Sequence, residues 1–152
     1  MARRYQPPSR ASSGWALPRW RVACFGRPVS YRVLVVDDEP GMRHMLAEVI
    51  GGMGHAVVTA ADGAEALERL RYAEELPCAI LIDMTMPHMD GRQLAAALRS
   101  DPAWSKIPFA LIGTNPAHER EASALGARSW LAKPIDVDRL MSALKDLCGI
   151  LA

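Results

Sequence analysis

The segment AILIDMTMPHMDG, residues 79–91, carries a carboxylate at the point where an apolar run meets a turn. Residues 79–82 have the composition of a strand that is buried on both faces, and Pro87 and Gly91 are typical of the turn that follows. Burying an unpaired carboxylate is costly. We therefore expect Asp83 to have a cationic partner or a path to water, and to bind a metal, act as a nucleophile or cap the next turn.

Strand-like and helix-like patterns alternate five times along the chain. Short apolar runs predict strands at residues 31–36, 55–60, 78–82, 108–112 and 129–132. Helical spacing and capping residues predict helices that begin near Pro40, Asp62 and Gly91 and that cover 117–125 and 137–147. This alternation predicts an α/β fold with a doubly wound parallel five-stranded sheet, in which ligands bind at the carboxyl ends of the strands.

Charge is distributed unevenly along the 152 residues, whose formal net charge is +1. Residues 1–30 contain six arginines and no acidic residue, and we interpret them as a disordered basic extension that precedes one domain at 31–150. The domain itself is mildly acidic, which argues against direct binding of nucleic acid. No apolar run is long enough to span a membrane, and we expect a cytoplasmic location.

The three cysteines, at positions 24, 78 and 148, lack the spacing of a metal site or a redox motif. We therefore predict a reducing compartment. Cys78 stands beside an apolar run, and we interpret it as a small core residue.

Charged residues follow three of the predicted strands. Asp37 and Asp38 end the first, Asp83 ends the third, and Lys133 stands before Pro134 after the fifth. If the first and third strands are neighbours, the three aspartates converge, and their mutual repulsion favours a divalent cation. Oxygen ligands without a nearby His or Cys pair favour Mg²⁺, and Lys133 is suited to holding a phosphoryl oxygen.

Three segments together, VLVVDDEPGMR, LIDMTMPHMDG and GARSWLAKP, resemble the receiver domain of two-component response regulators over about residues 31–150. The resemblance implies a flavodoxin-like (βα)5 fold. It also implies that Asp83 accepts a phosphoryl group from a histidine kinase or a histidine phosphotransfer protein. The implied roles of the other site residues are metal binding by Asp37, Asp38, Asp83 and the backbone carbonyl of Thr85, phosphoryl binding by Lys133, and a cis peptide bond at Pro134.

The sequence departs from the receiver pattern at two positions. Receivers usually end the fourth strand with Ser or Thr, whereas here Gly113 takes that position and Thr114 follows it. Because side chains alternate along a strand, Thr114 should point elsewhere unless the strand bulges. Trp130 replaces the usual Tyr or Phe of the switch. We expect intact phosphorylation chemistry with a weaker conformational response, which Gly113→Thr should strengthen.

Two alternatives stay open. A degenerate receiver would bind a protein partner without phosphorylation. A phosphatase of the haloacid dehalogenase type would need a second aspartate where Thr85 stands, so we expect no enzyme beyond self-catalysed phosphoryl transfer and dephosphorylation. We expect no output domain after residue 152, and therefore a stand-alone receiver that signals by contact with an unknown downstream protein.

Overall fold

Five strands and five helices alternate along residues 31–149, the part of the chain that the computed structural model describes. The strands are β1 (Arg32–Val36), β2 (Ala56–Ala60), β3 (Ala79–Asp83), β4 (Phe109–Gly113) and β5 (Ser129–Ala132). The helices are α1 (Pro40–Gly52), α2 (Gly63–Arg71), α3 (Gly91–Ser100), α4 (Ala117–Ala124) and α5 (Val137–Cys148). Each matches a predicted element. The predicted disordered extension, residues 1–30, lies outside the described residues.

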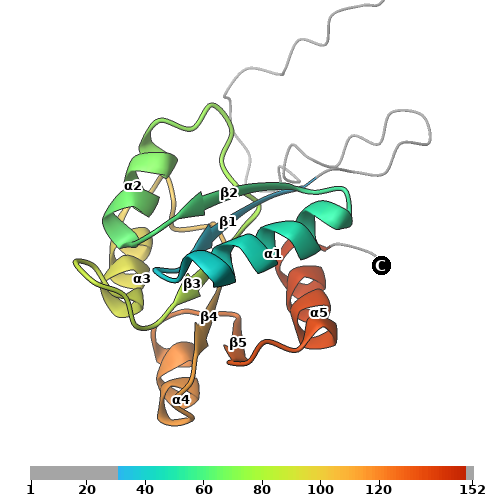
Figure 1. Ribbon diagram of the computed structural model, residues 1–152. Helices are drawn as coiled ribbons and strands as arrows, with labels where there is room; N and C mark the ends of the chain where they lie inside the picture. Colours follow the sequence, from blue (N-terminus) through green and yellow to red (C-terminus); the bar gives the residue numbers. More distant parts are fainter. Residues whose placement is uncertain (1–30, 150–152) are drawn as a thin grey trace, which may run out of the picture.

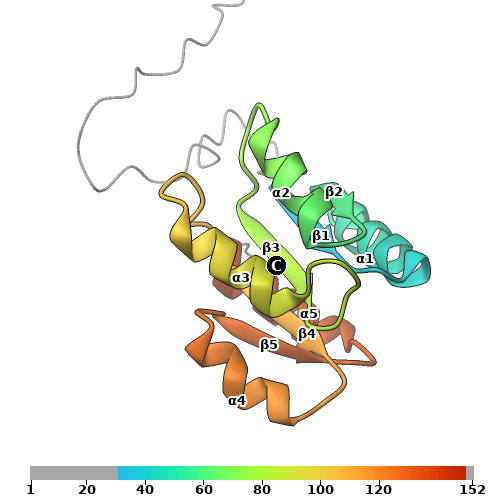
Figure 2. The same ribbon diagram turned by 90° about the vertical axis from the view of Figure 1, so that its left-hand side faces the viewer.

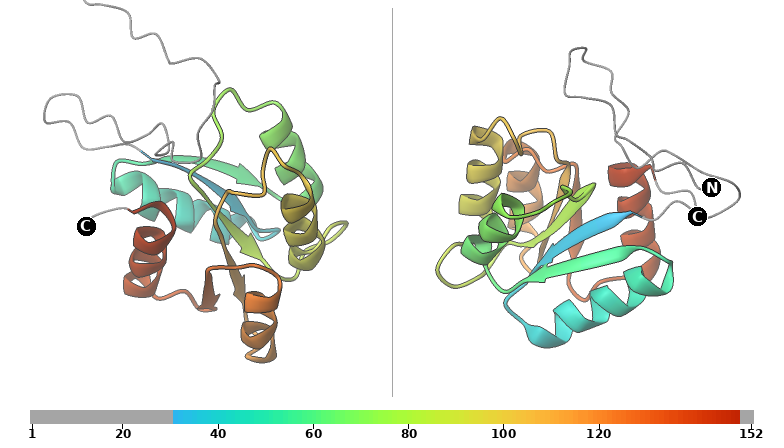
Figure 3. Two further views of the ribbon diagram at one scale, coloured as in Figure 1. Left: turned by 180° about the vertical axis from the view of Figure 1, so that it is seen from behind. Right: turned by 90° about the horizontal axis from the view of Figure 1, so that it is seen from above.

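The strands form one parallel sheet in the order β2-β1-β3-β4-β5. Helices α1 and α5 cover one face, and α2, α3 and α4 cover the other (Figures 1 and 3). The predicted doubly wound, flavodoxin-like fold is therefore confirmed. Strand β1 lies between β2 and β3, and Val36 pairs with Ile82, so the two strands end side by side.

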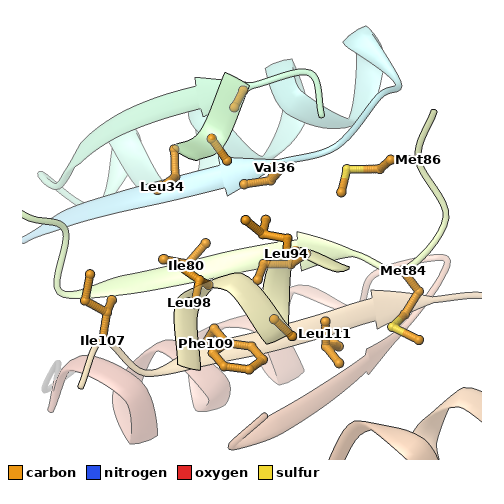
Figure 4. Packing of buried hydrophobic residues seen from close by; sticks show 14 of the residues in the cluster. Leu34, Val36, Ile80, Met84, Met86, Leu94, Leu98, Ile107, Phe109 and Leu111 are labelled. Carbon is orange, nitrogen blue, oxygen red and sulfur yellow. The ribbon is translucent and has the colours of Figure 1, made fainter. Parts of the chain in front are cut away.

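Alternate residues of each strand supply two hydrophobic clusters, one on each face of the sheet. Val33 and Val35 of β1 pack under α1 and α5, while Leu34 and Val36 pack under α2 and α3. Figure 4 shows the second cluster, in which Leu94 and Leu98 of α3 lie over Ile80 of β3, with Met84 and Met86 following the strand. All of β3 is buried, as its apolar composition predicted. The strand that delivers Asp83 is thus fixed from both sides.

The amino end of α3 approaches the end of β3 more closely than most residues would allow. A Cβ atom on Gly91 would lie 2.7 Å from the carbonyl oxygen of Asp83 and 2.8 Å from the Cα of Met84. Asp90 caps the helix by accepting a hydrogen bond from the Gln93 backbone N–H, and the Gln93 side-chain oxygen accepts one from the Asp90 backbone N–H. Figure 2 shows this helix beside the strand. The β3–α3 connection is thereby held next to Asp83.

The spacing of the cysteines indicates no metal site or redox motif, yet two of them are paired. Cys78 and Cys148 form a disulfide across a sequence separation of 70 residues. Cys78 does pack against the core, as predicted, but its partner comes from the last turn of α5. Sequence spacing could not reveal this pair because the fold, and not a local motif, brings the two residues together.

No helix within residues 31–149 combines the length and the apolar character that crossing a membrane requires.

Candidate functional site

Three aspartates meet at the carboxyl ends of β1 and β3. Carboxylate oxygens of Asp37, Asp38 and Asp83 all lie within 4.8 Å of one another. Asp37 is fully buried and Asp83 is 4% exposed, whereas Asp38 is open to solvent. The convergence follows directly from the pairing of β1 with β3, which places the two strand ends at the same edge of the sheet.

Lys133 joins the acidic cluster from the end of β5. Its Nζ lies 3.2 Å from Oδ2 of Asp83 and 3.1 Å from Oδ2 of Asp37. The backbone N–H of Lys133 donates to the carbonyl of Gly113 at 2.9 Å, which extends the pairing of β4 and β5 up to the site. The Lys133–Pro134 peptide bond is cis. One cation therefore bridges the two buried carboxylates, whose second oxygens have other partners.

Backbone donors hold the second oxygen of each buried carboxylate. Oδ1 of Asp37 accepts from the N–H of Glu39 at 2.9 Å, and Oδ1 of Asp83 accepts from the N–H of Thr85 at 3.2 Å. The Arg43 guanidinium, one helical turn into α1, donates to the backbone carbonyl of Asp37 at 2.7 Å. Sequence reasoning missed Arg43 as a positioning residue, although its place in VLVVDDEPGMR, six residues after Asp37, was the available signal.

The site perturbs the ionisation of both Asp83 and Lys133. Burial, together with the neighbouring charge of Asp37, raises the pKa of Asp83 from 3.8 to about 6, although the Thr85 N–H and Lys133 act in the opposite direction. Burial by itself would lower the pKa of Lys133, but the hydrogen bonds and charges of Asp37 and Asp83 outweigh it and raise that pKa.

Comparison with known proteins identifies the family. A family model of the response regulator receiver domain matches residues 33–145. The chain belongs to this family. This receiver is 31% identical over 117 residues to the chemotaxis protein CheY of Bacillus subtilis, with 76% of this chain and 96% of that protein covered. It is 34% identical over 127 residues to the transcriptional regulatory protein TcrA of Mycobacterium tuberculosis, covering 82% of this chain but only 48% of TcrA. It thus spans about half the length of TcrA.

Among solved structures, the receiver resembles the receiver domain of a sensor histidine kinase from Pseudomonas aeruginosa with a TM-score of 0.71. The match covers 80% of this chain and 99% of that one, at 24% sequence identity, and so it shows the fold alone. That structure has a magnesium ion coordinated in its active site cleft.

The donors at the acidic cluster fit a divalent cation. Asp37, Asp38 and Asp83 offer three carboxylate groups, and two of them are buried with a single lysine between them. Mg²⁺ prefers oxygen ligands and keeps several of its waters, which the exposed position of Asp38 permits. The Thr85 N–H fixes the loop beside the cluster. The role of the Thr85 carbonyl as a ligand stays a prediction.

The two departures from the receiver pattern prove to be one packing arrangement. Trp130 pairs with Leu111 in the β4–β5 register, so its side chain lies on the same face as that of residue 113. A Cβ atom on Gly113 would lie 2.6 Å from Cη2 of the indole. The Trp130 ring therefore occupies the space into which a residue 113 side chain would extend. Gly113 and Trp130 are complementary in size.

Thr114 follows the last residue of β4 and lies outside the position of the missing hydroxyl. The register runs regularly through the pair Gly113 and Ala132 without a bulge, and Thr114 is exposed beyond the strand. Among residues 31–149 no side-chain hydrogen bond joins Thr114 to Asp83 or Lys133. The strand has no bulge, as the alternation of side chains predicts, and a phosphoryl-binding role of Thr114 stays a prediction. The expectation for Gly113→Thr needs revision, because a threonine there requires a smaller side chain at position 130.

Proposed function

We propose that this receiver accepts a phosphoryl group on Asp83, with Mg²⁺ held by Asp37, Asp38, Asp83 and the backbone carbonyl of Thr85. The single observation that supports this most is the convergence of three carboxylates and Lys133 at one sheet edge. When bound, the metal ion supplies positive charge that offsets the phosphoryl oxygens and the crowded carboxylates. The presence of magnesium in a receiver of the same fold supports its choice as the ion.

The residues of the chain act by position and charge. Asp83 forms a new oxygen–phosphorus bond while the nitrogen–phosphorus bond of a phosphohistidine donor breaks and the imidazole leaves. Lys133 already contacts Oδ2 of Asp83, so it is placed to stabilise the added negative charge. The Thr85 N–H orients the Asp83 carboxylate through its other oxygen. Transfer and later hydrolysis need no separate enzyme, because the receiver's own residues hold the reacting groups.

Both the phosphoryl donor and the downstream target are proteins in this proposal. A histidine kinase or a histidine phosphotransfer protein supplies the phosphoryl group, and an unknown downstream protein reads the phosphorylated state by contact. The similarity to the chemotaxis protein CheY, which this chain covers over 96% of its length, supports signalling by contact between proteins. A cytoplasmic location and the lack of direct nucleic acid binding stay predictions.

A second candidate is a receiver that binds its partner regardless of phosphorylation. The packing of Trp130 against Gly113 favours it, because the position that usually senses the phosphoryl group carries no hydroxyl here. Treatment with acetyl phosphate and Mg²⁺, followed by intact mass measurement, separates the two. The first function predicts a gain of one phosphoryl group that EDTA prevents. An unchanged mass under all conditions would favour the second.

A further inference from the structure

The disulfide lies at the end of the sheet opposite to the phosphorylation site. Cys78 immediately precedes β3, and Asp83 is the last residue of the same strand. Cys148 is the last residue of α5, whose first turn follows the Lys133–Pro134 segment and is capped by Asp136. The Cα atoms of the two cysteines are 5.7 Å apart. The bond therefore connects the strand that carries Asp83 to the far end of the helix that follows Lys133.

The two cysteine residues differ in their exposure to solvent. Cys148 is 1% exposed and belongs to the hydrophobic cluster under α1 and α5. Cys78 is half-buried at the start of β3, where its backbone N–H donates to the Arg32 carbonyl at 2.8 Å. Thiol–disulfide exchange requires a thiolate to reach one of the sulfurs. Because Cys78 is the more exposed residue of the pair, we take its sulfur as the one that an external reagent reaches.

We propose that Cys78 and Cys148 form a reversible thiol–disulfide site, with Cys78 as its point of entry. In oxidation the Cys78 thiolate attacks a small-molecule disulfide and releases one small thiol, and the Cys148 thiolate then displaces the second. One protein disulfide and two small thiols result, and the two protons of the protein thiols end on those small thiols. Two molecules of the small thiol reverse the two steps and re-form the small-molecule disulfide. In its oxidised form the site holds the carboxyl end of α5 against the amino end of β3.

The first experiment measures whether the pair exchanges in the folded chain. The full chain and its Cys24→Ser variant are equilibrated with mixtures of glutathione and its disulfide, starting from the reduced and from the oxidised protein. Acid quenching, alkylation in denaturant and intact mass follow. Cys24→Ser should show either no alkyl group or two, with the same proportions from both starting states. Proportions that depend on the starting state, two alkyl groups in every mixture, a lasting mixed disulfide or a disulfide-linked dimer would each overturn the proposal.

A matched pair of variants tests the point of entry. In the Cys24→Ser background, Cys148→Ser leaves Cys78 as the sole thiol, and Cys78→Ser leaves only Cys148. Under native conditions an aromatic disulfide reagent should modify the chain that retains Cys78, and reactivity should be lost in the chain that retains the buried Cys148 until denaturant is added. Equal rates in the two folded variants would contradict the assignment of Cys78.

Hydrogen exchange tests whether the disulfide holds the carboxyl end of α5 against the amino end of β3. Reduction of Cys24→Ser should speed amide exchange in the last turn of α5, residues 144–148, while exchange in the first turn of α3 stays the same. Unchanged protection of residues 144–148 on reduction would show that the bond does not hold this end of the helix.

Discussion

The contact between Trp130 and Gly113 can be tested by adding one methyl group. In Gly113→Ala, the new Cβ would lie 2.6 Å from Cη2 of the indole. Carbon atoms in ordinary contact are about 3.5–4.0 Å apart, so the ring must move by about 1 Å. The backbone of Gly113 lies in β4 and has no positive φ, so alanine fits it without strain. The destabilisation caused by this substitution therefore measures the steric overlap between the new methyl group and the indole ring.

The expected cost combines two opposing effects. Overpacking a well-packed site costs about 1–3 kcal/mol. Replacing a strand glycine by alanine gains about 0.5–1 kcal/mol through reduced backbone entropy in the unfolded chain. Gly113→Ala should therefore lower the free energy of unfolding by about 0.5–2 kcal/mol. In a Trp130→Phe background, which removes the outer part of the indole, the same substitution should be neutral or stabilising.

Urea unfolding of the wild type, the two single variants and the double variant measures this coupling. Gly51→Ala is a matched control, because a Cβ there meets nothing within 4 Å and the residue lies inside α1. It should raise the free energy of unfolding by up to about 1 kcal/mol. Additivity of the Gly113 and Trp130 substitutions to within about 0.5 kcal/mol would refute the idea that the two residues share one space.

Three further predictions concern the site and the disulfide. The pKa of Asp83 in the folded chain, about 6, lies above its ordinary value of 3.8, so the folded state loses stability as the pH rises through this interval. At pH 7 without metal, Asp83→Asn should therefore be more stable than the wild type by about 2–3 kcal/mol. Thermal melts should show this difference shrinking towards pH 4. Mg²⁺ at about five times its dissociation constant should stabilise the wild type by about 1 kcal/mol, and Asp38→Ala should abolish this shift in melting temperature; an equal shift in the variant would remove Asp38 from the ligand set. The Cys78–Cys148 bond closes a loop of 70 residues, so its reduction should lower the free energy of unfolding by about 4 kcal/mol. Urea unfolding with and without a dithiol measures this change, and no change would show that the bond contributes nothing to the folded state.

The amino-acid sequence predicts the elements and the acidic site because both depend on local pattern. Apolar runs bounded by turn residues mark the strands, and the residues that follow them, such as Asp83 and Lys133, must lie at one edge of a parallel sheet. The convergence of the three aspartates required that β1 and β3 be neighbours. The order of apolar and polar residues did not predict this pairing, because strand order depends on the crossover connections. The resemblance to receivers supplied that order.

Contacts between distant residues were beyond this kind of reasoning. Cys78 and Cys148 are brought together by the packing of α5 under β3, across a sequence separation of 70. The size match of Gly113 and Trp130 depends on the β4–β5 register and on the length of the indole, which reaches diagonally from β5 to Gly113 on the adjacent strand β4. The individual residues of both pairs could be noted in the sequence, but the contacts between them could not be predicted.

The most direct test asks which residue carries the phosphoryl group. Borohydride reduction of the chain after treatment with a phosphorylated donor and Mg²⁺ converts an aspartyl phosphate to homoserine, and peptide mass spectrometry locates it. We predict homoserine at position 83, and none in Lys133→Ala or in chain treated without Mg²⁺, because the site then lacks the charge that holds the phosphoryl oxygens. Homoserine at Asp37 or Asp38, or at no position in the wild type, would contradict the assignment of Asp83 as the phosphoryl acceptor.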